Sequence, residues 1–290
     1  MGVKWGRVPR AALLAALIGL SLTGTAGAER LKVIVSFQPL FDVVSRVAAD
    51  AADVERAAPI GSSPHNFDPT VRDVTRIRAA QLAVMAGLGA DAWLERYVQS
   101  SGSRARVLKL GDQMTFVRLR SGRSTDPHWW LDASLMAQAA RLIGQELAAL
   151  DPAQADTYRA AAARESAALM ALHRELQTTL KPVQGGKLVT FHNAFGYFAR
   201  AYGLRVAATL APLEGIEASP ARLASAVAVI RSQGVRAVFA EPQLPPGPAR
   251  AVAAETGVPL YILDPEGSAA TPGYIAMMRA NRDTLLRALR

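Results

Sequence analysis

Short apolar runs alternate with stretches of helical periodicity along most of the chain. In five of these runs apolar residues occupy both faces of an extended strand: residues 31–37, 80–87, 187–192, 236–241 and 259–264. Strands that are apolar on both faces and separated by helices are typical of parallel sheets covered on both sides. The pattern therefore predicts an α/β fold.

The middle of the chain differs, because residues 151–180 form one unbroken helical pattern. Asp151 is a candidate cap, Pro152 suits a first helical turn, and Pro182 ends the pattern. Four leucines lie along one face, at positions 169, 172, 176 and 180. At 1.5 Å per residue such a helix is on the order of 40 Å long, enough to cross one small domain and reach the next.

We therefore predict two lobes, each a parallel sheet flanked by helices, joined by one long rigid helix. The predicted division is an N-terminal lobe at residues 29–150, the linker helix at 151–181 and a C-terminal lobe at 182–290. Gly, Ser and Pro residues, which would make a flexible hinge, do not separate the lobes.

The first 28 residues have the layout of a secretory signal peptide. Lys4, Arg7 and Arg10 precede an apolar run at residues 11–22, and small residues follow as far as Ala28. A run of about a dozen apolar residues is shorter than the roughly 20 that span a bilayer. We predict cleavage after Ala28 and export to the periplasm.

Composition and charge narrow the class of protein further. The chain has 290 residues, no cysteine and a formal net charge of +9, and removing the signal peptide, with three basic and no acidic residues, lowers that charge to +6. The remaining basic residues are scattered, which argues against nucleic acid as a partner. The absence of cysteine excludes disulfides, thiolate metal sites and a lipid-modified cysteine, so a soluble periplasmic protein is expected.

Candidate chemistry rests on the histidines, of which there are four. His65 lies in a turn-rich loop, His128 lies in the turn DPHWWLD, and His192 ends an apolar run, as Asp264 does further along. Ligands of open α/β sheets bind at such strand ends. Imidazole nitrogen and carboxylate oxygen suit a divalent first-row metal, although each histidine could also be a hydrogen-bonded loop residue. His173 lies within the long helix, and we assign it no role.

Several of these segments, in this order around a long helix, carry a resemblance: SPHNFDPT, DPHWWLD, FHNAFGYF, VRAVFAEPQ and YILDPEG. The chain resembles the metal-binding substrate-binding proteins of zinc and manganese ABC importers. The resemblance implies one metal held between two lobes by His65, His128, His192 and Asp264, and delivery to an ABC permease in the inner membrane. Zinc binders of this family usually have histidine at the third position, so His192 favours zinc.

The resulting hypothesis is a monomeric periplasmic receptor with high affinity for Zn(II), and not an enzyme; a metallochaperone is a further candidate partner. The alternatives are a manganese or iron(II) receptor of the same family and a secreted zinc metallohydrolase. The segment at residues 112–126 lacks the His- and Asp-rich loop of many zinc members, and Asn193 replaces a common acidic residue. We expect Trp129 and Trp130 to support His128 by packing, and Glu241 to support a ligand without binding metal.

Overall fold

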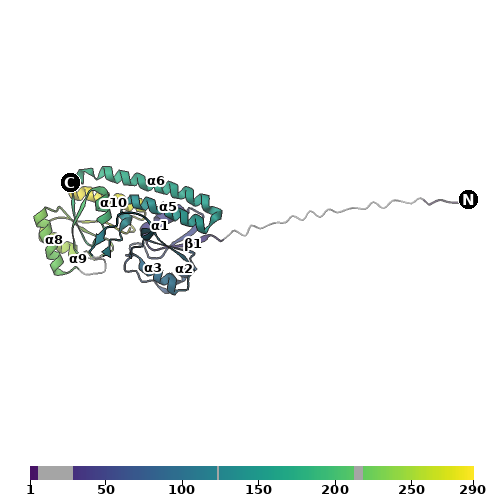
Figure 1. The fold of residues 1–290 in the computed structure, drawn as a ribbon, viewed down its shortest axis with the longest axis horizontal. Coiled ribbons are helices and arrows are strands. Elements are labelled where there is room, and N and C mark those ends of the chain that lie inside the picture. The colour runs from purple at the N-terminus through teal and green to yellow at the C-terminus, as the bar shows by residue number, and fades with distance from the viewer. Residues whose placement is uncertain (6–28, 123, 212–217) are drawn as a thin grey trace.

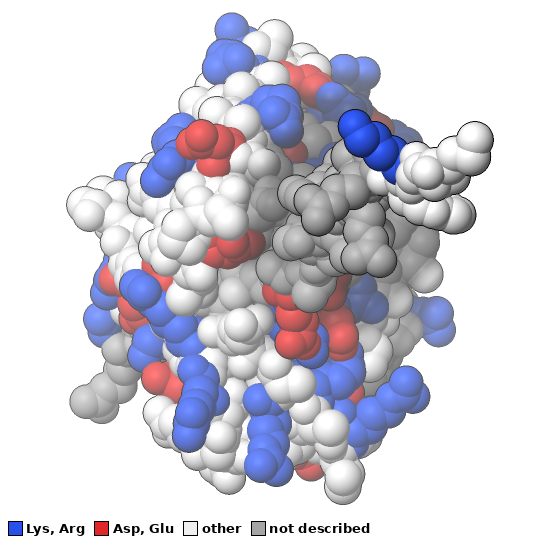
Figure 2. All heavy atoms as spheres, turned by 90° about the vertical axis from the view of Figure 1, so that its right-hand side faces the viewer, with Lys and Arg blue, Asp and Glu red and all other residues white. Residues whose placement is uncertain are grey.

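The computed structural model describes residues 1–5, 29–122, 124–211 and 218–290. The predicted signal sequence and its cleavage site fall largely outside these residues. Within them, no helix combines the length and apolar character needed to cross a membrane. Lys and Arg side chains are spread over the face drawn in Figure 2, with Asp and Glu side chains between them.

The N-terminal lobe is built on a four-stranded sheet in the order β2-β1-β3-β4. All three strand pairs are parallel. The strands are β1 (Leu31–Val35), β2 (Ala52–Arg56), β3 (Leu82–Met85) and β4 (Arg106–Lys109). The helices of this lobe are α1 (Gln38–Ala48), α2 (Val71–Ala79), α3 (Ala92–Ser100) and α4 (Leu110–Gln113). Central strand β3 is buried along its whole length, as its apolar sequence predicts.

The C-terminal lobe repeats this plan with a second parallel sheet in the order β10-β9-β7-β8. Its strands are β7 (Lys187–Thr190), β8 (Arg205–Thr209), β9 (Val238–Ala240) and β10 (Leu260–Ile262). Its helices are α7 (Gly196–Tyr202), α8 (Pro220–Gln233), α9 (Gly247–Thr256) and α10 (Tyr274–Leu289). The α/β class and the two parallel sheets are therefore confirmed.

A short segment joins the N-terminal sheet to the helices that cross the molecule. It contains the two-stranded hairpin β5 (Arg120–Ser121) and β6 (Ser124–Thr125), followed by the 3-10 helix η1 (Trp129–Leu131). Helix α5 (Ala133–Leu150) comes next, and the Asp132 side chain caps it by accepting a hydrogen bond from the Ser134 amide.

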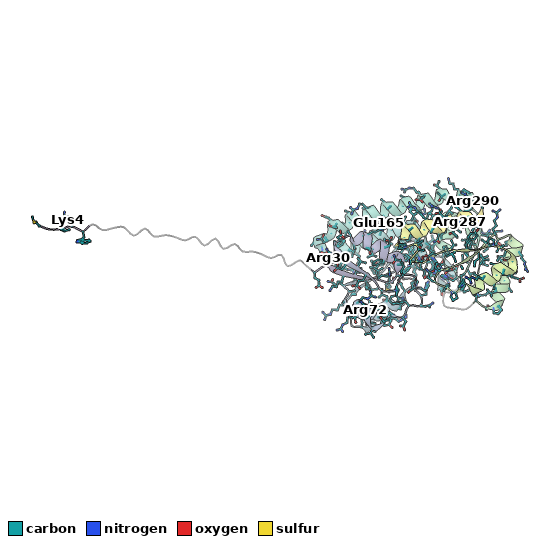
Figure 3. All side chains as sticks on the ribbon, turned by 180° about the vertical axis from the view of Figure 1, so that it is seen from behind. Lys4, Arg30, Arg72, Glu165, Arg287 and Arg290 are labelled. Carbon is teal, nitrogen blue, oxygen red and sulfur yellow. The ribbon has the colours of Figure 1, made fainter. Side chains whose placement is uncertain are left out.

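The predicted long helix is present as α6 (Ala155–Thr179), preceded by the 3-10 turn η2 (Pro152–Gln154) and followed by η3 (Lys181–Val183). Figure 1 shows it lying along one long side of the molecule over both lobes. From behind, the helix spans from the lobe that carries Arg30 and Arg72 to the end of α10, near Arg290 (Figure 3).

Packing holds this helix against both lobes. It contacts α1 of the N-terminal lobe, α5, and α10 of the C-terminal lobe, and the four leucines at positions 169, 172, 176 and 180 are buried. A Cβ atom at Gly144 of α5 would collide with that of Ala162, so the absence of a side chain lets the two helices approach closely. One apolar core includes Val33 of the first sheet and Leu188 of the second.

One helix-end prediction is wrong. The Asp151 side chain makes no capping hydrogen bond at the start of the long helix. Its Oδ2 instead accepts a hydrogen bond of 3.0 Å from the Tyr158 hydroxyl, two turns into the helical segment. The carboxylate is directed at the tyrosine hydroxyl, and the first amides of the helix receive no hydrogen bond from it.

Candidate metal centre

Three of the four histidines meet between the lobes. His65 follows β2, His128 immediately precedes η1, and His192 follows β7, so both sheets contribute. The Nε2 atom of His128 is 3.1 Å from that of His65 and 3.2 Å from that of His192. Nitrogen ligands about 2.0–2.1 Å from a tetrahedral metal lie about 3.3 Å apart, so this spacing fits three corners of a metal shell.

His128 is fixed in position by Asp126, two residues before it. Asp126 Oδ1 accepts one hydrogen bond from the His128 amide, at 3.0 Å, and contacts the ring Nδ1 at 2.7 Å. Burial lowers the pKa of His128 well below its usual value, and the nearby His192 adds to this effect. Burial thus favours the neutral imidazole, and a ring that donates from Nδ1 to Asp126 leaves its Nε2 lone pair free for a metal.

Asp126 is itself almost fully buried. Burial raises the pKa of Asp126 to about 7. The hydrogen bond from the His128 amide and the charges of His192 and His65 act in the opposite direction, because they favour the ionised carboxylate. Its Oδ1 atom contacts both the backbone amide and the ring Nδ1 of His128, which fixes the rotamer and the tautomer of that histidine.

His192 repeats this arrangement with a carboxylate that is distant in sequence. Glu241 Oε2 lies 2.6 Å from His192 Nδ1, and its Oε1 accepts from the His192 amide at 3.1 Å. Glu241 thus contacts the far side of the ring, in agreement with a supporting role. The Nδ1 atoms of His128 and His192 both face carboxylates, and their Nε2 atoms lie 3.2 Å apart. Rings that donate from Nδ1 leave their Nε2 lone pairs available to a cation between them.

The loop that carries His65 is anchored by helix α3. The Trp93 indole donates to the Pro64 carbonyl at 2.7 Å, directly before the histidine. The Tyr97 hydroxyl donates to Asp68 at 2.9 Å, three residues after it. Both aromatic residues come from α3, so this helix anchors the loop on either side of His65. The histidine itself is half-buried, whereas His128 and His192 are 4% and 1% exposed.

The two tryptophans after His128 tie it to both lobes. The Trp129 indole donates to the Ala86 carbonyl of the N-terminal lobe at 3.0 Å. The Trp130 indole donates to the Pro265 carbonyl of the C-terminal lobe at 2.8 Å, and its ring centroid is 5.1 Å from that of His128. Both indoles are fully buried. They anchor the segment that carries the histidine.

Asp264, the fourth predicted ligand, follows β10 and is buried. Its Oδ1 accepts from the Gln243 side chain at 2.9 Å and from the amides of Glu266 and Gly267 at 3.1 and 2.8 Å. Its Oδ2 accepts from the Thr271 hydroxyl at 3.1 Å. Among the described residues, the group whose ligand atoms all lie within 4.8 Å of one another consists of the three histidines. Ligation by Asp264 stays a prediction.

The remaining histidine and the supporting residues complete the comparison with the sequence. His173 lies on α6, with Nδ1 3.5 Å from Asp132 Oδ1, away from the cluster. Sequence reasoning identified neither Asp126 nor Trp93 as a supporting residue. The signal for Asp126 was its position two residues before a histidine, whereas Trp93 contacts a residue 29 positions away and left no local signal.

Comparison with known proteins agrees with this geometry. Residues 33–288 match the family model for the zinc-uptake complex component A, periplasmic, ZnuA. The manganese-binding lipoprotein MntA of Halalkalibacterium halodurans is 30% identical over 287 residues, covering 96% of this chain and 95% of the relative. The iron-binding protein YfeA of Yersinia pestis is 28% identical, covering 90% of this chain and 86% of the relative.

A crystal structure of ZnuA superposes with a TM-score of 0.81 at 26% identity, covering 90% of this chain and all of that one. The match extends over both lobes and the long helix. The chain therefore belongs to the ZnuA family, the periplasmic metal-binding receptors of ABC importers.

Proposed function

We propose that the protein captures Zn(II) between its lobes with high affinity and delivers it to an ABC permease in the inner membrane. The observation that carries the proposal is the convergence of three histidine Nε2 atoms, 3.1 and 3.2 Å apart across His128. Cleavage after Ala28 would release a soluble, monomeric periplasmic form. A metallochaperone that loads the receptor is a further proposed partner.

The nitrogen-rich ligand set supports zinc over the harder cations. Imidazole suits zinc, while manganese prefers more carboxylate and carbonyl oxygen. Relatives named for manganese and iron keep those metals as the alternative cargo. In either case we propose that a carboxylate from the loop after β10 completes the shell, and Asp264 is the residue that the sequence predicts for this role.

The supporting carboxylates favour a receptor over a hydrolase. A catalytic zinc site keeps an open position for water and needs a base to activate it. Asp126 and Glu241 each contact a ring Nδ1 and a backbone amide of a histidine, so they orient the ligands. We propose that no bond of a substrate is made or broken at this site.

The test is metal retention. Residues 29–290, expressed without a histidine tag and stripped of metal, are offered equimolar zinc, manganese and iron(II) without oxygen, and bound metal is measured by mass spectrometry. We expect one zinc per chain, lost in His128→Ala and kept in His173→Ala, the matched control. Retained manganese or iron would change the cargo, and no bound metal would contradict the receptor.

A further inference from the structure

Helix α7 begins four residues after His192 and holds the segment that leads to the other buried histidine, His128. The Tyr197 hydroxyl accepts a hydrogen bond of 2.9 Å from the Leu119 amide. The Leu119 carbonyl accepts one of 2.9 Å from the Asp126 amide, and this bond extends the hairpin of β5 and β6 by one residue pair. The Asp126 carboxylate contacts the ring and the amide of His128. A chain of hydrogen bonds therefore leads from α7 to a candidate metal ligand.

Two further contacts from the same helix fix the start of this segment. The Phe116 ring packs edge-on against the ring of Tyr197, with the centroids 5.9 Å apart. The Arg200 guanidinium donates a hydrogen bond of 3.2 Å to the Val117 carbonyl. Helix α7 thus holds residues 116–119 through side chains on its surface, and the path of the chain toward the metal site depends on the C-terminal lobe.

The first residue of α7, Gly196, lies against the carboxylate of Asp126. A Cβ atom at this position would be 2.6 Å from Asp126 Oδ2, closer than real Cβ atoms approach another atom. The backbone of Gly196 is not left-handed, so its conformation does not require a glycine. The close approach of the carboxylate does require one. Asp126 therefore bridges α7 and His128, with Oδ2 toward the helix and Oδ1 on the histidine.

The space at Gly196 controls a contact with little tolerance. A methyl group there would have to move Asp126 by about 1 Å to reach an ordinary van der Waals distance. The contact between Asp126 Oδ1 and His128 Nδ1 is 2.7 Å long. A hydrogen bond lengthened by that amount is no longer effective, so the ring would lose the partner that orients it.

We propose that Gly196 and Tyr197 act as positioning residues for metal binding, an inference that rests on the proposed function. They set the Asp126 carboxylate, which in turn orients the His128 ring. One short segment of the C-terminal lobe, residues 192–197, then carries one ligand and positions another. The two buried histidines are placed relative to each other before metal arrives, which lowers the cost of ordering them on binding.

The experiment compares Gly196→Ala with Gly247→Ala, the matched control. Gly247 is likewise the first residue of a helix, α9, and a Cβ atom there would meet no atom within 4 Å. Zinc affinity is measured by competition with a chromogenic chelator, and the visible absorption of the Co(II)-loaded protein reports the ligand geometry. We expect Gly196→Ala to weaken zinc binding by about 10–100-fold and to change the cobalt bands. The control should match the wild type in both.

A double-mutant cycle separates positioning from a general structural effect. Asp126→Ala removes the carboxylate that the added methyl group would displace, so Gly196→Ala should cause no further loss of zinc affinity in that background. Tyr197→Phe removes the acceptor of the Leu119 amide and keeps the ring. It should weaken zinc binding by about fivefold, and it decides the question if Gly196→Ala does not fold.

Thermal unfolding of the apo proteins completes the test. A lowered Tm with wild-type zinc affinity in both Gly196→Ala and Tyr197→Phe would mean that α7 only stabilises the fold, and would overturn the inference. Losses that add fully in the double variant of Gly196 and Asp126 would overturn it as well. Absence of bound metal from the wild type would instead overturn the proposed function, on which the inference rests.

Discussion

The segments that carry His128 and His192 differ from the loop that carries His65. His128 and His192 are almost completely buried, and each has its ring Nδ1 and its amide bound to one carboxylate. His65 is half-buried, and its surroundings are anchored by Trp93 and Tyr97 through the backbone of Pro64 and the side chain of Asp68. Two ligands are thus deeply buried beside a carboxylate, whereas the third is more exposed, on a loop anchored by two aromatic residues of α3.

The difference suggests how metal is taken up and released. Helix α6 packs on helices of both lobes and one apolar core includes both sheets, so wide hinge closure is disfavoured. We expect His128 and His192 to keep their positions, and the His65 loop to rearrange, when metal enters or leaves.

The largest effect on zinc affinity should come from removing one of the two buried histidines, His128 or His192. His192→Ala should weaken zinc binding more than 100-fold, beyond the loss typical of residues that only orient ligands. His65→Ala should weaken zinc binding less than His192→Ala, because water can take the place of a half-exposed ligand. Chelator competition measures both. A loss in His65→Ala as large as in His192→Ala would break the comparison.

The next largest effect on zinc affinity should come from the carboxylates that contact these two histidines. Asp126→Asn should lower zinc affinity by about 10–100-fold, because the neutral amide no longer fixes the tautomer that leaves the Nε2 lone pair free. Glu255→Gln is the matched surface control, since Glu255 pairs with Arg231 on the exterior. Isothermal titration with a competing chelator measures the difference. Affinity equal to that of the control would show that Asp126 has no orienting role.

Acid should weaken binding by about tenfold between pH 8 and 6. The pKa of Asp126 is raised to about 7, so below that pH the apo protein binds a proton that must leave when the ionised carboxylate supports metal-bound His128. The pKa of His128 is lowered, so its own protonation competes only well below pH 6.5. Zinc affinity measured at several pH values should fall as pH drops, and less steeply in Asp126→Asn. Unchanged affinity between pH 8 and 6 would show that no Asp126 proton is released when metal binds.

The smallest effect concerns the loop anchor. Trp93→Phe keeps an aromatic ring, although a smaller one, and removes the donor to the Pro64 carbonyl, a hydrogen bond worth about 1 kcal/mol. Zinc release should become about fivefold faster, by stopped-flow with an excess of chelator. Tyr261→Phe, a change on β10 away from the loop, is the control. An unchanged release rate would mean that the loop does not control metal exchange.

The five apolar runs predicted every central strand of the two parallel sheets and one edge strand, β10. The other edge strands, β2, β4 and β8, lie outside these runs. An edge strand is covered less completely, so β4 keeps Arg106 exposed and Lys109 half-exposed, and its sequence lacks the apolar signal on both faces.

Part of the candidate site could be predicted from the sequence, and part depends on tertiary packing. Histidines at strand ends could be found because topology brings those ends together. The turn that employs Asp264, and the Trp93 contact to the His65 loop, depend on tertiary packing that leaves no pattern in the chain. Asp151 shows the same limit, since a tyrosine hydroxyl engages the expected helix cap.

The central claim is that three imidazole Nε2 atoms converge on one metal ion. X-ray absorption at the zinc edge of the loaded protein tests it most directly, because imidazole rings give a characteristic outer-shell scattering. We expect three imidazole nitrogens and oxygen from a carboxylate, at about 2.0–2.1 Å. A spectrum with fewer than three imidazoles, or with an all-oxygen shell, would contradict the account.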